Sequence, residues 1–400
     1  MAKLRLGVAG LGRAFMLMLP TLGHHPNVEL VAAADPRPEA RAAFVRDFSR
    51  PDNPARAYAT VEELAADADV EAVYVATPHQ FHVAHVAALA ASGKHLLVEK
   101  PMALTLADCD HMIDAAARAG VHLLVGHSHS FDTPYLATAT LIASGQYGAV
   151  RMITALNFTD FLYRPRRPEE LITADGGGVV FSQAAHQVDV VRLLGGGRVA
   201  SVRAVTGIWD RQRPTEGAYQ AFLTFESGAS ASLTYSGYAR FDTDELMGWI
   251  GELGQLRDAN AYGLARAGLR GIISADEEMA LKTSRTYGVA AVPTSGRPAQ
   301  HNHFGVVIAS CEHADLRPMP DGIQIYGNDR RTFVPLAAPH VPRFEVVDEL
   351  AAAVRSNCPP LHSGAWGRAT LEVCLAILDS ARTGREIRLG HQVAVVETPS

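Results

Sequence analysis

Short apolar runs alternate with amphipathic stretches through the first third of the chain. The runs predict buried strands over Leu4–Ala9, Val28–Ala34, Val70–Ala76, His95–Val98 and Val121–Val125. The stretches between them space their apolar residues as one face of a helix does. They predict a helix after Gly12 that ends near Leu22, and further helices over Pro38–Asp47, Thr60–Ala66, Phe81–Ser92 and Leu106–Ala119. This alternation is typical of βαβ units, so residues 1–127 are expected to form a doubly wound parallel sheet of the α/β class.

The pattern changes after residue 127, where a helix is expected over Pro134–Ala143 and strands with alternating apolar positions follow. The strands are expected over Val150–Phe158, Val199–Trp209, Ala218–Phe225 and Ala229–Tyr238, and their spacing favours an antiparallel meander. Further helices are expected over Val179–Leu194, Phe344–Val354 and Trp366–Thr383, while residues 260–300 show little periodicity and are expected to be a long excursion. Residues 128–400 are therefore predicted to form one α+β domain.

Composition and charge exclude several classes of protein. The 400 residues are 48% hydrophobic and carry 36 Lys and Arg against 42 Asp and Glu, which gives a net charge of −6. That balance argues against binding to nucleic acid or to an anionic membrane surface. The apolar run Leu6–Leu19 is split by Arg13, so neither a signal peptide nor a membrane span is expected. Four scattered cysteines indicate no disulfide framework, which suits a reducing cytoplasm.

A glycine motif follows the first predicted strand. Gly10-Leu11-Gly12 lets the backbone turn tightly and approach a pyrophosphate at the start of the next helix, although Phe15 stands where a third small residue is usual. Asp35 ends the second strand, where a carboxylate can accept both hydroxyls of a ribose. The alternative is a tight turn with a capping Asp35. We favour NAD as the cofactor, and Arg37 leaves NADP open.

Two other strand ends meet the same edge of the predicted sheet. Thr77-Pro78-His79-Gln80-Phe81-His82 follows the third strand, and Glu99-Lys100-Pro101 follows the next. Ligands bind at the carboxyl ends of parallel strands in open α/β sheets. A lysine at such a place is usually solvated, but the following proline fixes the chain direction and favours an ammonium that points into the cleft.

A third candidate motif lies in the second part of the chain. Gly176-Gly177-Gly178 precedes a predicted helix that carries Gln183, His186 and Asp189 at three-residue spacing, near one face. A lone helical histidine is more often structural. One that follows flexible glycines and precedes an aspartate is a candidate general base.

Together these motifs resemble the Gfo/Idh/MocA oxidoreductases. The resemblance rests on Gly10/Gly12, Thr77-Pro78…His82, Glu99-Lys100-Pro101, Val125-Gly126 before Phe131, and Gly176-Gly177-Gly178…His186…Asp189. Within that family, Phe158–Glu170, Gly176–Leu194 and Cys311–Asp329 are similar to bacterial dihydrodiol dehydrogenases of the 4,5-dihydroxy-4,5-dihydrophthalate type.

The resemblance implies a fold, a cofactor and a set of partners. It implies an N-terminal Rossmann domain, an open and mostly antiparallel C-terminal sheet that pairs copies into a homodimer or homotetramer, and a small-molecule substrate. The cofactor-binding residues would be Gly10, Gly12, Arg13, Ala14, Asp35, Thr77, Pro78, His79, His82, Glu99, Lys100 and His127.

The resemblance also implies a mechanism. Lys100 would hold the nicotinamide ribose and the substrate hydroxyl, and His186 would be the acid/base. The family commonly has an aspartate at the position of Ser182 and an arginine at that of Ser130, and both departures weaken a polyol assignment. We expect oxidation of a ring alcohol, in particular a cis-dihydrodiol dicarboxylate that becomes a catechol.

Three arginines precede the glycine run. Arg164, Arg166 and Arg167 stand in a proline-stiffened segment, and arginine binds carboxylates in a bidentate manner. We expect them to hold the substrate carboxylates, with Gln183 and Asp189 completing the substrate site. The alternative is a solvated loop that pairs with Glu169 and Glu170.

Two histidine pairs and two rival functions complete the set of hypotheses. His127-Ser128-His129 and His301-Asn302-His303 lack carboxylate or cysteine partners at typical spacing, so no metal site is expected.

The first rival function is a sugar or inositol dehydrogenase of the same family. The second is a dinucleotide-sensing regulator without catalysis, against which Lys100 and His186 argue.

Overall fold

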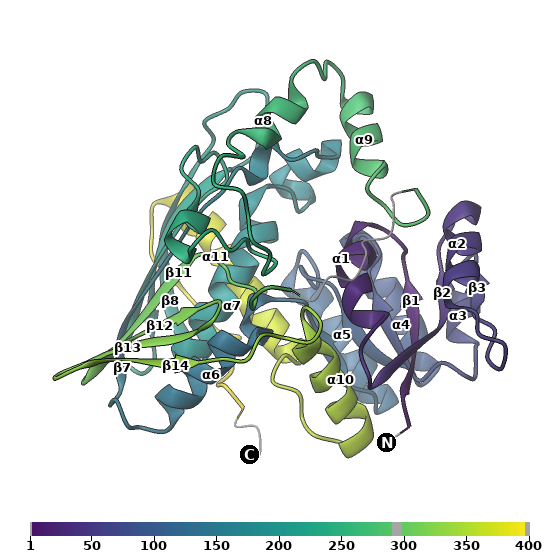
Figure 1. The fold of residues 1–400 in the computed structure, drawn as a ribbon, viewed down its shortest axis with the longest axis horizontal. Helices are drawn as coiled ribbons and strands as arrows, with labels where there is room; N and C mark the ends of the chain where they lie inside the picture. Colours follow the sequence, from purple (N-terminus) through teal and green to yellow (C-terminus); the bar gives the residue numbers. More distant parts are fainter. Residues whose placement is uncertain (1, 290–297, 397–400) are drawn as a thin grey trace.

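The computed structural model describes residues 2–289 and 298–396, and its first sheet contains six parallel strands in the order β3-β2-β1-β4-β5-β6 (Figure 1). The strands are β1 Leu4–Ala9, β2 Val28–Ala34, β3 Arg56–Tyr58, β4 Ala72–Val75, β5 His95–Val98 and β6 Leu123–Val125. The helices between them are α1 Arg13–Leu22, α2 Pro38–Phe48, α3 Val61–Ala65, α4 His82–Ala91 and α5 Leu106–Ala119. The sheet is doubly wound, as predicted, and only the three-residue β3 was not anticipated.

The second sheet has nine strands in the order β14-β13-β12-β11-β7-β10-β9-β8-β15. Its strands are β7 Val150–Phe158, β8 Val199–Gly207, β9 Ala218–Phe225, β10 Ser230–Ser236, β11 Val306–Cys311, β12 Ala314–Met319, β13 Gly322–Gly327, β14 Arg331–Pro335 and β15 Ile387–Arg388. The predicted meander is present as β8-β9-β10, while β7 pairs with β10 in the parallel direction. The α/β class with a mostly antiparallel second sheet is thus confirmed.

Helices cover only one face of the second sheet. They are α6 Thr133–Ala143, α7 Ala185–Leu194 and α11 Gly364–Thr383. Because successive side chains of a strand point to opposite faces, alternate residues of β7, β8, β9, β13 and β14 remain on the uncovered face. Large apolar side chains are exposed there: Met152, Val205, Phe222, Tyr326 and Phe333.

Two late segments pack against the core of the first sheet. α10, Phe344–Ser356, buries Val346, Val347 and Leu350 in the same cluster as Leu4 and Phe15. The excursion after residue 260 forms α8, Leu264–Leu269, and α9, Ala275–Thr283, and then returns to α1 and α2 (Figure 1).

Tyr287 anchors the end of this excursion. Its ring is buried and meets Phe15 edge-on with centroids 5.1 Å apart, and its hydroxyl donates to Asp47 over 2.7 Å. The part of the predicted excursion at residues 290–297 lies outside the described residues. Among the helices that are described, none is long and apolar enough to cross a membrane.

Candidate active site

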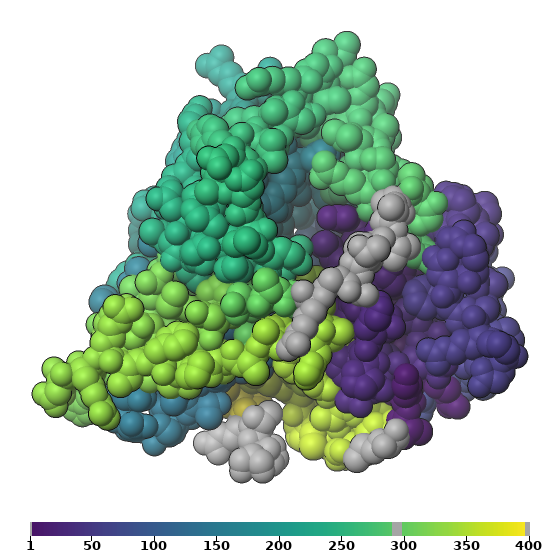
Figure 2. All heavy atoms as spheres, viewed as in Figure 1, coloured from purple at the N-terminus to yellow at the C-terminus, as the bar shows by residue number. Residues whose placement is uncertain are grey.

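A large cleft opens where the carboxyl ends of β1, β4 and β5 face the second sheet. Both parts of the chain line it, from Gly12, Thr77 and Lys100 on one side to Arg166 and His186 on the other. Figure 2 shows the molecule hollowed beneath the segment that contains α8 and α9, and Lys282 and Thr283 at the end of α9 line this cleft. The position agrees with the rule that ligands of open α/β sheets bind outside the carboxyl ends of the strands.

The glycine turn is shaped for a dinucleotide. Gly10 has a φ of +94°, and a Cβ there would lie 2.9 Å from the backbone of Ala76, so only glycine fits. A Cβ on Gly12 would meet nothing within 4 Å, which leaves the N-terminus of α1 open to a phosphate. Asp35 accepts the amide proton of Leu11 over 2.8 Å at the end of β2. These residues fit a bound NAD.

Arg37 is occupied by contacts inside the protein. Its Nε lies 3.0 Å from Asp35, and its two terminal nitrogens donate to Thr286 over 2.9 Å and to the carbonyl of Leu11 over 2.8 Å. The guanidinium therefore ties the end of β2 to the returning excursion, close to where an adenosine ribose would lie.

His79 and His82 follow β4 and hydrogen-bond to backbone carbonyls of neighbouring loops. Nε2 of His79 lies 2.9 Å from the carbonyl oxygen of Asp175, across the cleft from its own strand. The buried ring of His82 lies 3.0 Å from the carbonyl of Met102 and 2.9 Å from that of Thr77. Both rings line the cleft, as do Arg13, Ala14 and Pro78.

Lys100 reaches across to the second part of the chain. Its Nζ donates to the carbonyl oxygen of Ser182 over 2.8 Å. Ser182 lies in a π-helical turn, Val180–Ala184, immediately before α7, and such turns are frequent at functional sites. Burial lowers the pKa of Lys100, and the neighbouring Glu99 carboxylate partly offsets this effect.

His186 lies on the first turn of α7 and lines the same cleft as Lys100. Its Nδ1 is buried and has no hydrogen-bond partner among the described residues. Burial, followed by the positive charge of Lys100, lowers the pKa of His186 well below 6.5, so the imidazole is neutral at neutral pH. The structure thus places Lys100, which follows β5, and His186, on α7, in the same cleft.

Ser182 and Asp189 lie about one turn before and after His186, and neither hydrogen-bonds to its imidazole. The hydroxyl of Ser182 donates to the carbonyl of Gly178, one turn earlier. Asp189 is buried and points away from the cleft: it accepts from Trp366 and Thr370, each over 2.6 Å, and from Ser130.

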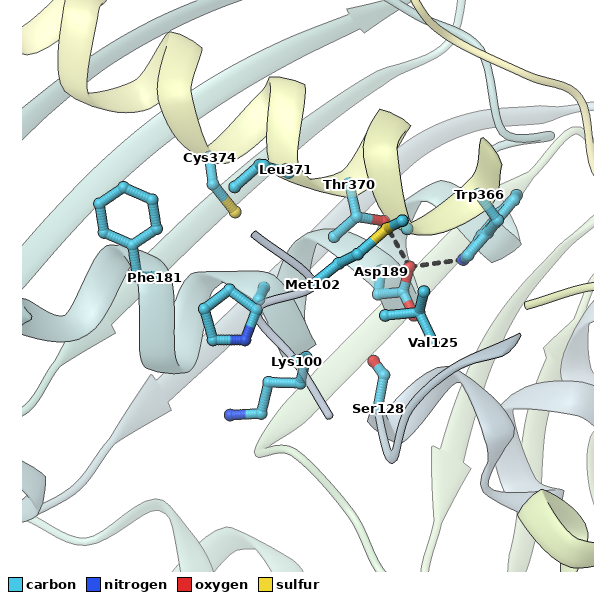
Figure 3. Close-up of a pocket in the computed structure, with 13 residues that line it drawn as sticks. Lys100, Met102, Val125, Ser128, Phe181, Asp189, Trp366, Thr370, Leu371 and Cys374 are labelled. Atoms are coloured by element: carbon cyan, nitrogen blue, oxygen red, sulfur yellow. Dashed lines mark hydrogen bonds between the residues drawn. The ribbon is translucent and has the colours of Figure 1, made fainter. Parts of the chain in front are cut away.

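Asp189 instead lines a small internal cavity behind Lys100 (Figure 3). In that view the Lys100 side chain points away from Asp189, whose carboxylate lies between α7 and α11. Side chains of the protein itself donate hydrogen bonds to both oxygens of Asp189, so its role is structural. Its helical spacing had instead predicted a contact with the substrate. Gln183 does line the main cleft, where its Oε1 accepts from Tyr235 over 3.2 Å.

The three arginines of the loop differ in their partners. Arg167 lies 3.1 Å from Glu169 and 3.8 Å from Glu170, and Arg164 lies 3.2 Å from Asp160. Arg166 forms no ion pair with any described carboxylate; its guanidinium carbon lies 3.6 Å from the centroid of the Phe161 ring. All three line the cleft.

Burial acts most clearly on Arg166. It lowers the pKa of this guanidinium to about 10, and its Nε has no partner among the described residues. One terminal nitrogen donates to the carbonyl of Phe161 over 2.6 Å, and the half-buried guanidinium has no partner among the described carboxylates, which favours an anionic ligand.

His127 and His129, which were expected to line the cleft, do so, but their carboxylate partners were not predicted from the sequence. Asp132 accepts from His129 over 2.6 Å and from His127 over 3.1 Å, and Glu252 approaches the other side of His129 at 3.4 Å. The spacing argument had found no carboxylate for the first histidine pair, yet Asp132 stands three residues after His129. Donor atoms of His127, His129 and Asp132 lie within 4.8 Å of one another, and hydrogen bonds account for the arrangement.

The fold and the cleft together define a dehydrogenase with a Rossmann dinucleotide site, and comparisons with known proteins agree. A family model described as an oxidoreductase family with an NAD-binding Rossmann fold matches residues 4–127. A second model, the GFO/IDH/MocA C-terminal domain, matches residues 135–257. The chain therefore belongs to the GFO/IDH/MocA family of NAD-binding oxidoreductases, which confirms the predicted family, enzyme class and cofactor.

Individual relatives are similar along much of the chain. It is 47% identical to the 1-carboxy-3-chloro-3,4-dihydroxycyclohexa-1,5-diene dehydrogenase of Comamonas testosteroni over 95% of each sequence. It is 28% identical to a trans-1,2-dihydrobenzene-1,2-diol dehydrogenase of Macaca fuscata fuscata, over 58% of this chain and 72% of the relative. The crystal structure of a putative dehydrogenase from Bordetella bronchiseptica RB50 has 41% identity and a TM-score of 0.90, covering 97% of this chain and 100% of that one.

Proposed function

We propose that this enzyme oxidises a carboxylated cyclohexadiene cis-diol to the corresponding catechol, with NAD as the oxidant. The observation that carries the proposal is the position of Arg166, a half-buried cation without an ion-pair partner among the described carboxylates, in the same cleft as Lys100 and His186. The relative from Comamonas testosteroni supports it, since its name describes a dehydrogenase for a carboxylated dihydroxycyclohexadiene. A 4,5-dihydroxy-4,5-dihydrophthalate type of substrate carries two carboxylates, for which Arg164 is the second candidate.

His186 and Lys100 have complementary roles in this reaction. His186 is neutral and accepts the proton of the hydroxyl that is oxidised, and a positioned base of this kind contributes roughly 10²–10⁴-fold to a rate. The Lys100 ammonium donates to the same oxygen as negative charge develops on it. NAD, when bound, supplies the acceptor for the carbinol hydride.

The substrate itself favours the forward direction. Loss of a hydride and a proton from a cyclohexadiene diol gives a ketone that tautomerises to an aromatic catechol. A substrate disposed to lose a hydride needs less help from a base. That property is compatible with Ser182 at the position where relatives place an aspartate.

The test is a substrate panel followed at the absorbance band of reduced nicotinamide. We expect carboxylated cis-dihydrodiols to reduce NAD, and uncarboxylated dihydrodiols, inositols and glucose to do so at least about 10-fold less efficiently, because one charged hydrogen bond is worth about 1.5–3 kcal/mol. A preference for inositols or glucose would overturn the proposal. So would the same kcat/KM for diols with and without a carboxylate.

We also propose that two copies of the chain pair through the uncovered face of the second sheet. Its exposed apolar side chains come from strands across the sheet, and a second copy presents the same set, as a twofold interface requires. Single exposed apolar residues are ordinary, whereas a set on one flat face indicates an interface.

A further inference from the structure

Asp132 is the centre of a hydrogen-bond network that belongs to no element of the assigned reaction. Its Oδ2 accepts from Nδ1 of His129 over 2.6 Å, and its Oδ1 accepts from Nε2 of His127 over 3.1 Å and from the amide of Asn302 over 3.2 Å. All four side chains are buried. The protonation state of His129 and of His127 follows from which of their ring nitrogens must donate a hydrogen in this network.

His129 carries two protons and a positive charge. Its Nδ1 faces Asp132, and its Nε2 faces Glu252 at 3.4 Å. A carboxylate can only accept, so each nitrogen must supply a hydrogen. Burial works against this charge, but the two carboxylates outweigh it and raise the pKa of His129. The charge of Asp132 is thus balanced by His129, and the carboxylate remains free to orient His127.

His127 is a neutral imidazole of one fixed tautomer. Because Nε2 donates to Asp132, the lone pair resides on Nδ1. Nδ1 has no hydrogen-bond partner among the described residues, and the residue lines the cleft. Burial lowers the pKa of His127 to about 3, with Arg343 adding to the effect, so the ring is a neutral acceptor at neutral pH.

His127 lies beside the proposed base. The ring centroids of His127 and His186 are 6.3 Å apart, and both rings line the cleft that holds Lys100. His127 and His186 are therefore two neighbouring neutral imidazoles in the cleft that Lys100 also lines. A single alcohol needs only one such acceptor.

We propose that His127, oriented by Asp132, binds the second hydroxyl of a vicinal diol while His186 takes the proton of the first. The inference rests on the proposed function and deepens it by assigning the residue that selects a diol over a simple alcohol. The hydroxyl under oxidation loses its proton to His186, and the carbon that bears it gives up a hydride, for which NAD, when bound, would be the acceptor. The other hydroxyl keeps its proton and donates it as a hydrogen bond to Nδ1 of His127. Asp132 is a positioning residue, since it acts through the imidazole.

The native enzyme gives the first test. The probes are a cis-dihydroxycyclohexadiene carboxylate and its two monohydroxy analogues with the same ring, assayed with NAD at saturating cofactor. A monohydroxy substrate leaves Nδ1 of His127 desolvated and unpaired, so we expect its kcat/KM to be about 10–100-fold lower.

Variants give the second test. We expect His127→Leu to lower kcat/KM for the diol by about 10–100-fold and to change that for the monohydroxy substrates by less than about 3-fold. His127→Gln retains an acceptor and should recover part of the preference. Asp132→Asn should reduce the preference for the diol over the monohydroxy substrates, although the imidazole of His127 is still present. His122→Gln is the matched control, because that ring does not line the cleft; among the described residues it hydrogen-bonds to Asn357 at 3.1 Å and stacks on His95.

The outcomes separate the two proposals. If the native enzyme oxidises no carboxylated diol, the proposed function fails and this inference fails with it. If it oxidises diol and monohydroxy substrates equally well, or if His127→Leu lowers both alike, the role of His127 is overturned and the proposed function stands. Fluorescence titration with NADH identifies a variant whose cofactor site is damaged, and the comparison on the native enzyme requires no variant at all.

Discussion

The ammonium of Lys100 donates a hydrogen bond to the carbonyl oxygen of Ser182 across the junction of the two sheets, over 2.8 Å. This contact fixes the end of β5 against the π-helical turn that precedes His186. The relative position of the ammonium and the imidazole is therefore set by a backbone atom, and the identity of the side chain at position 182 does not affect it.

Replacing Lys100 by methionine should abolish most of the activity without removing the cofactor. The variant keeps an unbranched side chain that is one atom shorter but loses the charge that stabilises the substrate oxygen, so kcat should fall about 10²–10³-fold. Steady-state kinetics with a carboxylated dihydrodiol measure this fall, and NADH fluorescence measures cofactor binding. Retention of kcat within a factor of about three would contradict the role assigned to Lys100.

Arg166 and Arg167 should differ sharply although they are neighbours. Arg166→Ala should raise KM for a carboxylated diol about 10–100-fold, because a charged hydrogen bond is worth about 1.5–3 kcal/mol. Arg167 is already paired with Glu169 and Glu170, so Arg167→Ala is the control and should change KM little. Equal effects of the two variants on substrate and on NADH binding would show that Arg166 is not a carboxylate ligand.

The pH profile should report His186 on its acid side. A base must be neutral to accept a proton, and the pKa of His186 lies well below 6.5 because of burial and Lys100. We therefore expect kcat/KM to stay constant from neutral pH downward past 6.5 and to fall only in more acidic buffer. His186→Asn should remove this fall along with most of the activity. An acid limb centred at 6.5 or above would be inconsistent with the environment of this ring.

Chelators should leave the activity unchanged. The histidine nitrogens that face Asp132 donate to its oxygens, so the three side chains satisfy one another by hydrogen bonds without a cation. Assays before and after dialysis against EDTA, with elemental analysis of the protein, measure this directly. A stoichiometric metal whose removal stops turnover would show that the network is a metal site.

The oligomeric state should depend on the uncovered face of the second sheet. Phe222 is half exposed on β9, the third strand from one edge of that face, opposite Arg203 and Ser232 on the neighbouring strands. Phe222→Glu should shift the protein from dimer to monomer in light scattering after gel filtration. Leu256→Glu is the control, since Leu256 is more exposed but belongs to no strand of this sheet. A monomeric native protein, or a dimer unaffected by Phe222→Glu, would exclude this face.

Local periodicity was sufficient for much of the fold. The strands β1, β2, β5 and β7 begin and end at the predicted residues, because their apolar runs are bounded by turn residues. Strands β11 to β14 were not predicted. They are short and mix glycine, proline and charged residues, as in Ala314–Met319, and they gain stability from pairing with neighbours rather than from their own composition.

The cleft was predictable only where a motif marks a strand end. Lys100 and the glycine turn follow strands, so topology alone directs them to one edge. Glu252 meets His129 from 123 residues further along the chain, and no local pattern records such a contact. Asp189 failed as a substrate contact for a related reason: helical spacing gives the face of a residue but does not reveal that Trp366 and Thr370 occupy its carboxylate.

The anchoring of Tyr287 has a consequence for any attempt to divide this protein. The cluster that contains Phe15 and Phe44 is completed by Tyr287 and by Val346 and Leu350 of α10, all of which come from beyond residue 127. A truncated chain that stops where the first sheet ends would leave these aromatic rings bare to water and would be prone to aggregate. The nucleotide-binding half is thus continuous in space but discontinuous in sequence, and it has to be expressed with the segments that finish it.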